Sequence, residues 1–425
     1  MWFRRPPDNP KLSNQRASVA LTRTRLPVDL LAPGMRIVKL DRPWTEVPVL
    51  FQGFTIDNAD QLSLLRHYCD WVLVEAETRT LAPLMSKIEA RRRRREQPMP
   101  ESRSLESELP GASRAYAAGQ RFVSRMLADI EAGNMLDLTD SRPVIAACVT
   151  SISANPNAMF WMNRIKHQDA YTAEHCLRVA IFAVAFARFL DFPKQDMEVI
   201  GLCGLLHDIG KMHVPKTILN KPGALNSEEM AEMKRHTEYG FSLLQSHHTL
   251  DPIVAAVCRD HHERLDGRGY PRGLEAWQIS RFARLISIVD AYDAITSDRC
   301  YRAGLSASDA MRILFRERNK QFDPELIEAF IRMIGIYPPG SLVEMTNGEI
   351  AVVIGTHPSY KLRPRIEILL NGDKQPIAQR LVDLKDEPTD DNGHIYTIAA
   401  PLPDGAYDIS LSRRVRDMIR NQSIS

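Results

Sequence analysis

The stretch from Thr172 to Leu190 is the feature that most limits how this chain can fold. Its residues are apolar on almost every side of a helix, and Glu174 and Arg178 are among its few charges. A helix that is apolar all round must be covered on every side. Its longest apolar run, Val179 to Ala187, is too short to cross a bilayer. We therefore expect a central helix inside a larger helical body.

The residue pattern changes twice along the 425 residues, which are too many for one ordinary domain. Short strands, turns and one helix over residues 25–85 predict a small N-terminal α+β module, and residues 112–336 indicate a nearly all-helical region. Asn-Gly and Asp-Gly pairs between short apolar runs predict a C-terminal β appendage over residues 337–425. A flexible tail (residues 1–24) and an Arg-rich linker (residues 86–111) complete a multidomain, mainly α chain.

Five consecutive arginines, Arg91 to Arg95, lie inside the predicted linker. Such a run can bind phosphates or an anionic membrane surface. The simpler interpretation, which we favour, is the solvated end of a helix that runs into the linker.

Several features predict a cytoplasmic protein. The N-terminus lacks the long apolar segment of a signal peptide, and no stretch reaches 18 apolar residues. The six cysteines are scattered without a CxxC pair, which favours reduced, mostly buried thiols. The 55 Lys and Arg residues nearly balance the 53 Asp and Glu residues, so no global basic field attracts nucleic acid and no DNA partner is expected.

Five histidines and two aspartates of the helical region recur at intervals that suit one helix and its return. The successive gaps are 32, 29, 25 and 28 residues, so one group from each helix can converge in a core. A single buried histidine is usually a core residue whose hydrogen bonds are made within the fold, but this whole set is hard to explain in that way. The set consists of His175, His207, Asp208, His236, His261, His262 and Asp290. His236 is expected on a helix that begins near Ser227.

Imidazole and carboxylate ligands together favour divalent Fe, Mn, Zn, Ni or Co. Seven ligands exceed what one six-coordinate ion uses, so we expect two ions with a bridging aspartate. Two ions about 3.5–4 Å apart clamp a phosphate and lower the pKa of a bridging water, which is the chemistry of phosphodiester hydrolysis. The remaining histidines are predicted to lie outside the site: His67, His167, His213, His247, His248, His357 and His394.

Three segments of the helical region carry a family resemblance. They are His207-Asp208-Ile209-Gly210-Lys211, His261-His262-Glu263-Arg264-Leu265-Asp266-Gly267-Arg268-Gly269-Tyr270-Pro271, and Asp290-Ala291-Tyr292-Asp293-Ala294-Ile295-Thr296-Ser297-Asp298-Arg299-Cys300-Tyr301-Arg302. In this order they resemble the HD-GYP family, a branch of the HD phosphohydrolases whose members hydrolyse the bacterial messenger cyclic di-GMP. The resemblance covers about residues 165–335. The segment from Val28 to Glu75 resembles the uncharacterised N-terminal domain often fused to such proteins.

The resemblance implies a helical HD-type phosphohydrolase domain that hydrolyses cyclic di-GMP. It implies that the seven residues above are the ligands of two metal ions, Fe or Mn in the first place, with Zn, Ni or Co as alternatives. Asp208 is the implied bridge and, with Lys211, is catalytic. The implied substrate contacts are Lys211, Tyr270, Arg299 and Arg302. A cation at a helix end stays an alternative for Lys211, as does a surface role for the two arginines.

Two positions bear on subtype and partners. Some members of the family bind a third metal through a Glu one helical turn before the first histidine, where this chain has Tyr171. The resemblance therefore implies two metals and mainly pGpG as product, with GMP slow or absent. The Gly269-Tyr270-Pro271 loop either contacts the substrate or docks partner proteins such as diguanylate cyclases, and Gly267 and Gly269 let it turn tightly.

Two alternative functions stay open on the sequence. One is hydrolysis of another cyclic dinucleotide. The other is a non-catalytic cyclic di-GMP receptor or scaffold that binds diguanylate cyclases, although the intact ligand set argues against it. A homodimer is compatible with the sequence.

Overall fold

The computed structural model describes residues 21–41, 47, 53–69, 71–95, 101–164, 171–297, 304–357, 360, 362–390, 393–403 and 405–422. Contacts group the chain into two compact units, residues 1–89 and 90–425. No helix in these described ranges is long and apolar enough to cross a membrane. The domain boundaries proposed from the sequence stay predictions.

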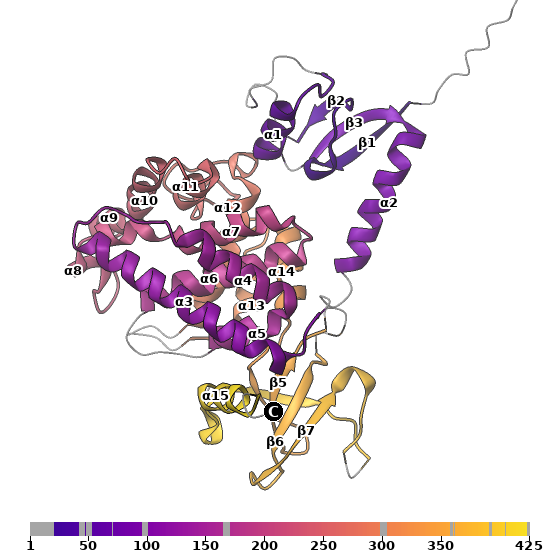
Figure 1. Ribbon diagram of the computed structural model, residues 1–425, viewed down its shortest axis with the longest axis vertical. Helices are drawn as coiled ribbons and strands as arrows, with labels where there is room; N and C mark the ends of the chain where they lie inside the picture. Colours follow the sequence, from indigo (N-terminus) through magenta and orange to yellow (C-terminus); the bar gives the residue numbers. More distant parts are fainter. Residues whose placement is uncertain are drawn as a thin grey trace, which may run out of the picture. The chain divides into compact units, whose positions relative to one another are not determined.

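The first unit is a small α+β module, as the sequence predicts (Figure 1). Its elements are β1 (Leu21–Pro27), η1 (Val28–Leu30), β2 (Arg36–Leu40), α1 (Ala59–Tyr68) and β3 (Trp71–Glu77), and α2 (Thr78–Arg95) follows. The three strands pair antiparallel in the order β1-β3-β2. Asn58 caps α1 by accepting a hydrogen bond from the backbone N–H of Gln61.

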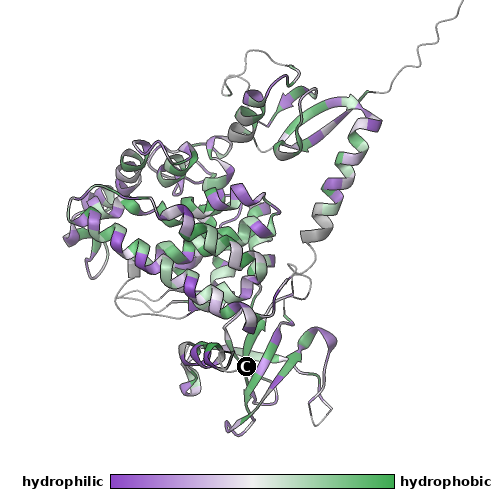
Figure 2. Ribbon diagram, viewed as in Figure 1, coloured by the Kyte–Doolittle hydropathy of each residue, from purple (hydrophilic) through white to green (hydrophobic). Residues whose placement is uncertain are grey.

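The second unit contains a helical body. Its helices are α3 (Leu105–Glu131), α4 (Ser141–Ala154), α5 (Pro156–Arg164), α6 (Tyr171–Phe189), α7 (Lys194–Leu206), η3 (Ile209–His213), α8 (Lys216–Leu219), α9 (Ser227–Lys234), α10 (His236–Gln245), α11 (Pro252–Asp260), η4 (Ala276–Gln278), α12 (Arg281–Thr296), α13 (Ala307–Arg316) and α14 (Pro324–Ile334). Helix α6 is central: it contacts α3, α4, α5, α7, α12 and α14. Figure 2 shows hydrophobic residues concentrated among these central helices. The prediction of a covered apolar helix is confirmed.

The C-terminal part is an antiparallel sheet, as predicted, with the strand order β7-β6-β5-β4-β8. Its elements are β4 (Leu342–Met345), β5 (Ile350–Gly355), β6 (Arg365–Leu370), β7 (Pro376–Asp383), η5 (Leu384–Asp386), β8 (Ile398–Leu402) and η6 (Ala406–Asp408). Alternate residues of a strand face opposite sides of a sheet. Ile350 and Val352 accordingly join the core of the helical body, whereas Ala351 and Val353 join a second apolar cluster.

Two helices depart from the sequence expectation. Helix α3 begins at Leu105, inside the stretch expected to be a linker, because Ser104 caps it and Leu105 and Leu109 are buried. The last described element is also a helix, α15 (Leu411–Gln422), in the segment predicted to be a β appendage. Leu411 and Val415, one helical turn apart, pack into the core of the helical body, which gives this Arg-rich segment an apolar side.

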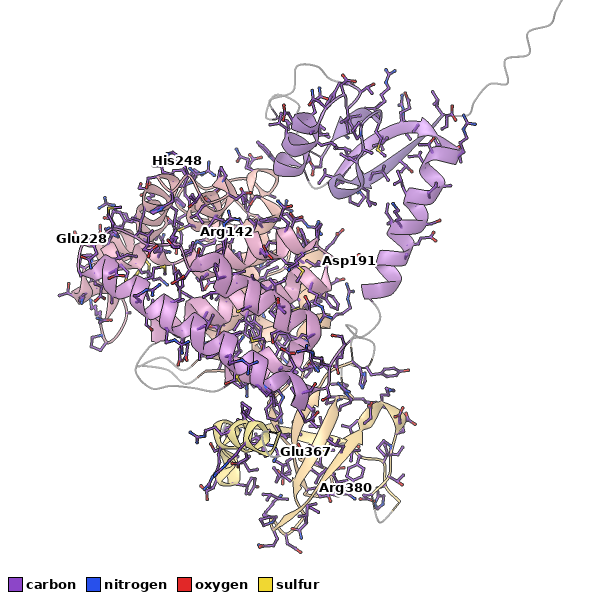
Figure 3. All side chains as sticks on the ribbon, in the orientation of Figure 1. Arg142, Asp191, Glu228, His248, Glu367 and Arg380 are labelled. Atoms are coloured by element: carbon purple, nitrogen blue, oxygen red, sulfur yellow. The ribbon has the colours of Figure 1, made fainter. Side chains whose placement is uncertain are left out.

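Several predicted surface and core positions agree with the structure. His248 is exposed, and Figure 3 shows it at the edge of the helical body. The five cysteines within the described residues are buried and form no disulfide with one another; they are Cys69, Cys148, Cys176, Cys203 and Cys258. Helix α2 ends at Arg95, the last of the five arginines.

The contact between α6 and α7 predicts a sensitive glycine. A Cβ atom on Gly204 would lie 2.8 Å from Cα and 3.0 Å from N of Ala180, which are backbone atoms that cannot rotate away. We expect Gly204→Ala to lower the free energy of unfolding by about 1–3 kcal/mol, measured by urea denaturation. The control Gly111→Ala meets only the Glu108 side chain, at 2.9 Å, so its effect should be smaller. Equal effects would contradict this account.

Candidate metal centre

The structure brings all seven predicted ligands together from five parts of the helical body. His175 lies on α6, and Asp290 lies on α12. His207 and Asp208 directly follow α7, and His261 and His262 directly follow α11. His236 corrects one detail of the sequence analysis: α9 ends at Lys234, and His236 is the first residue of α10.

A glycine allows His207 and Asp208 to approach His236. Gly210 lies in η3, and a Cβ atom there would collide with the carbonyl oxygen of His236 and the backbone nitrogen of Gly240. Only glycine lets η3 press this closely on α10. The Gly in His-Asp-Ile-Gly-Lys is therefore a packing requirement of the site.

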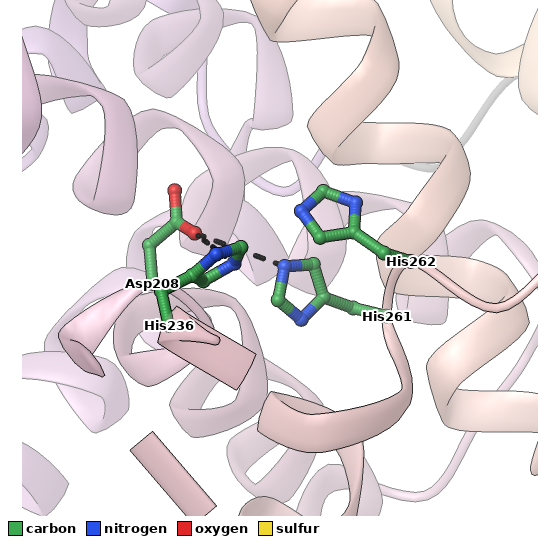
Figure 4. Close-up of side chains that lie close together, drawn as sticks. All are labelled: Asp208, His236, His261 and His262. Atoms are coloured by element: carbon green, nitrogen blue, oxygen red, sulfur yellow. Dashed lines mark ion pairs between the residues drawn. The ribbon is translucent and has the colours of Figure 1, made fainter. Parts of the chain in front are cut away.

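Asp208 lies at the centre of the cluster, and its two carboxylate oxygens face two different groups of histidines. Oδ1 is 3.3 Å from Nε2 of His236 and 3.7 Å from Nε2 of His261 (Figure 4). Oδ2 is 3.2 Å from Nε2 of His207 and 3.4 Å from Nε2 of His175. Asp290 Oδ1 lies 3.2 Å from Nε2 of His175. A carboxylate placed between two nitrogen clusters has the geometry of a bridging ligand.

Three histidines are held with one ring nitrogen turned toward the cluster. The Nδ1 atoms of His207, His236 and His261 each hydrogen-bond the backbone carbonyl three residues earlier, at 2.8, 2.7 and 2.8 Å. A carbonyl only accepts, so each Nδ1 carries a hydrogen, and whenever one of these rings is neutral its Nε2 presents a lone pair to the cluster. These Nε2 atoms, and Oδ1 of Asp208, are buried without a hydrogen-bond partner.

Buried polar atoms normally have partners. Orphaned imidazole lone pairs that converge on an orphaned carboxylate oxygen are the donor set of a metal site. The residues present therefore fit divalent ions. The potential ligand groups are Asp208 with His236, His261 and His262; His175 with His207 and Asp208; and His207 with His261 and Asp290.

The histidines of the cluster differ in their pKa values. Burial lowers the pKa of His236 and His261, and it lowers the pKa of His262 to about 3, so these rings are neutral and able to ligate at pH 7. Burial also acts to lower the pKa of His207, but the neighbouring Asp208 carboxylate outweighs it and raises that pKa to about 9. Burial opposes ionisation of Asp208, but Lys211 and His207 hold its pKa well below the usual range.

Three residues behind the candidate ligands, which the sequence analysis did not assign to the site, orient His175. Asp293 Oδ2 lies 2.8 Å from Nδ1 of His175, and Arg178 donates to both oxygens of Asp293, at 2.8 and 3.1 Å. Glu174 accepts from Arg178 at 3.2 Å. A carboxylate behind a ligating histidine fixes its ring and raises its basicity. The sequence signal was present: two charges in the apolar helix α6 need a buried partner.

Glu263, which the sequence analysis did not assign to the site, holds the Gly-Tyr-Pro loop next to the candidate ligands. Its buried carboxylate accepts hydrogen bonds from the backbone N–H groups of Arg272, at 2.7 Å, and Leu274, at 2.9 Å. Gly269 passes so close to Glu263 that a Cβ atom would lie 2.5 Å from its Cα. The ring of Tyr270 lies 4.7 Å from the ring of His262 between centroids.

The cluster opens into a cavity of about 1300 Å³. Lys211 and Tyr270 line it beside the ligands, and Lys211 also donates to Asp208. A cavity of this size exceeds the ~300–1,000 Å³ of typical small-molecule pockets. Arg299 and Arg302 lie outside the described residues, so their predicted substrate contacts stay predictions.

The fold and this cluster define a helical hydrolase domain with a histidine–aspartate metal centre. The HD domain family matches residues 151–326. A domain of unknown function, DUF3391, matches residues 23–140, and a KOW domain associated with HD domains matches residues 342–390.

Curated relatives extend the match over most of the chain. A cyclic di-GMP phosphodiesterase of Pseudomonas aeruginosa is 36% identical over 373 residues, which are 85% of this chain and 88% of the relative. The cyclic di-GMP phosphodiesterase response regulator RpfG of Xanthomonas campestris is 34% identical over 40% of this chain and 45% of its own. A 3'3'-cGAMP-specific phosphodiesterase of Vibrio cholerae is 34% identical over 44% of this chain and 43% of its own. The chain belongs to the HD-GYP family of HD-domain phosphodiesterases.

The contact of Asp293 with His175 and Arg178 leads to a prediction. Asp293→Asn keeps the shape but removes the charge that orients His175 and pairs with Arg178, so we expect metal affinity to fall about 10- to 100-fold. Titration of the metal-free protein with Mn(II) measures this loss. Asp417→Asn, an exposed change on α15, is the control and should bind like the wild type. Unchanged affinity in Asp293→Asn would show that this contact is not needed to hold the metal.

Proposed function

We propose that this chain is a metal-dependent phosphodiesterase that hydrolyses cyclic di-GMP, mainly to pGpG. The observation that carries the proposal is the buried Asp208 carboxylate between two groups of histidine nitrogens, at the wall of a large cavity. The P. aeruginosa relative, matched over most of both chains, is named for this activity, which supports the same substrate here.

The seven residues of the cluster hold two divalent ions in this proposal, with Asp208 as the bridge. Fe or Mn is the expected metal, and Zn, Ni and Co are alternatives that the same ligands accept. When bound, such ions supply positive charge to the phosphoryl oxygens and lower the pKa of a coordinated water.

The chain's own residues position the diester. Lys211 lies within reach of Asp208 at the cavity wall, so its ammonium group can contact the scissile phosphate as a point charge. Burial and the carboxylates of Asp208 and Asp290 raise the pKa of Tyr270, so its hydroxyl stays protonated and can donate a hydrogen bond. Arg299 and Arg302 are proposed to hold a phosphate or guanine through their guanidinium groups.

The location of Tyr270 supports a substrate role for the Gly-Tyr-Pro loop, since the side chain lines the cavity. Docking of diguanylate cyclases on this loop stays a second proposal for the same residues. A homodimer and a cytoplasmic location likewise stay proposals.

One alternative substrate has specific support. Three V. cholerae relatives that match the HD region are named 3'3'-cGAMP-specific phosphodiesterases. Parallel assays with cyclic di-GMP and 3'3'-cGAMP distinguish the two substrates. The receptor alternative is not favoured, because relatives that keep this domain are named as enzymes.

Asp208→Ala tests the metal mechanism. It removes the carboxylate that both histidine groups face, so we expect the rate of cyclic di-GMP hydrolysis to fall by at least about 10³-fold. Chromatography of the reaction products measures this rate. A chelator should abolish wild-type activity, and Mn(II) or Fe(II) should restore it. Substantial turnover by Asp208→Ala would refute the proposed role of Asp208.

Metal content and product test the two-ion proposal. Anaerobically purified protein should contain two ions per chain, and pGpG should accumulate with little GMP. Tyr171→Glu introduces the carboxylate that the family resemblance associates with a third metal. We expect this variant to bind more metal and to form more GMP, with Tyr171→Phe as the control. Three ions in the wild type would contradict the proposal.

A further inference from the structure

The cavity extends beyond the metal cluster along helix α6. His175 and Phe182 both line it, and their separation of seven residues corresponds to about 10 Å along a helix at ~1.5 Å per residue. Its walls include three aromatic residues, Phe160, Phe182 and Tyr292. The ring centroids of Phe160 and Phe182 are 5.5 Å apart, and those of Phe182 and Tyr292 are 5.4 Å apart. A flat apolar group suits this space.

One polar side chain in this part of the cavity wall is unexplained. Asn163, near the C-terminal end of α5, lines the cavity and is only 7% exposed. Neither Nδ2 nor Oδ1 of its amide has a hydrogen-bond partner among the described residues. An amide buried without partners destabilises a fold, because it gives up its hydrogen bonds to water.

The neighbouring asparagines show what a purely structural role looks like. The Nδ2 group of Asn155 donates to the carbonyl of Arg103 at 3.0 Å, and its Oδ1 accepts from the backbone N–H of Asn157 at 3.0 Å. Asn157 donates to Glu101 at 2.8 Å. Both are buried, and both use their amides within the fold. Asn163 is also buried and lines the cavity, but its amide has no such partner among the described residues.

We infer that Asn163 recognises a nucleobase of the bound dinucleotide through its Watson–Crick edge. The inference rests on the proposed function. Guanine presents the N1–H donor beside the O6 acceptor, and an asparagine amide offers the complementary pair: Oδ1 accepts from N1–H while Nδ2 donates to O6. The apolar walls cover the faces of the base. Asn163 is therefore a specificity-determining residue remote from the metal ligands.

Asn163→Leu separates this role from a structural one. Leucine has a similar volume but no hydrogen-bonding groups, so we expect kcat/KM for cyclic di-GMP to fall about 10- to 100-fold. Hydrolysis of bis(4-nitrophenyl) phosphate, which has no nucleobase, should stay within about twofold. The melting temperature should stay the same or rise, because an unpartnered buried amide has been removed. Loss of both activities in equal measure would overturn the inference, as would full retention of cyclic di-GMP hydrolysis.

Asn155→Leu is the matched control. It removes an amide that is satisfied within the fold, so it should lower the melting temperature and leave the ratio of the two activities unchanged. Asn163→Asp is a second variant, because a carboxylate accepts from N1–H and N2–H of guanine but repels the N1 acceptor of adenine. It should raise the preference for cyclic di-GMP over cyclic di-AMP in competitive binding, and an unchanged preference would count against the inference.

Failure of the proposed function can be distinguished from failure of this inference. If the metal-loaded wild type does not hydrolyse cyclic di-GMP, the proposed activity is wrong. Calorimetric binding of cyclic di-GMP to the wild type and to Asn163→Leu then still tests the base contact, with about 10-fold weaker binding expected in the variant. Equal binding, or no binding by the wild type, would overturn the inference.

Discussion

The buried carboxylate of Asp208 is the group on which the arrangement of the site depends. Each of its oxygens faces a different set of imidazole nitrogens, and Lys211 donates to it from the cavity side. A buried carboxylate is tolerated only where positive charge or donors surround it. Hydrogen bonds from Nδ1 to backbone carbonyls orient three of the histidines, His207, His236 and His261, and their Nε2 atoms have no hydrogen-bond partner among the described residues. This donor set fits divalent cations.

The helical body provides this arrangement through close packing around α6. Helix α6 packs against six other helices, which hold His175 and Arg178 in the interior. Glycines let neighbouring segments approach one another closely. Gly210 lets η3 press on α10, and Gly269 lets the Gly-Tyr-Pro loop pass over Glu263. The core of the helical body continues into one face of the C-terminal sheet and into α15. The residues after Pro338 are thus part of the packing that supports the catalytic region, and Pro338 itself lines the cavity.

The sequence was informative where the residue type itself carries the chemistry. Histidines and aspartates at helix-length intervals predicted the ligand set, and the structure brings all seven together. It was less informative where the role depends on what lies across space. Asp293, Glu263 and Asn163 are ordinary polar residues in the sequence. Asp293 supports His175 only because α12 packs against α6, and the lack of a partner for the Asn163 amide shows only in the folded chain. The start of α3 had a local signal in the Ser104 cap that was not used, and α15 was missed because its stability depends on the burial of Leu411 and Val415 against the helical body.

The sequence by itself determined the fold class and the helical character of the region that carries the candidate ligands, and it singled out those seven residues as candidates. Periodicity and residue chemistry are local properties, so they can be read along the chain. Only the tertiary structure decided that Asp208 lies between two histidine groups, that Arg178 and Asp293 support His175, and that the cavity runs on to Asn163. These features are distances between residues far apart in the chain. They are fixed by the packing of whole helices around α6, which no local pattern encodes.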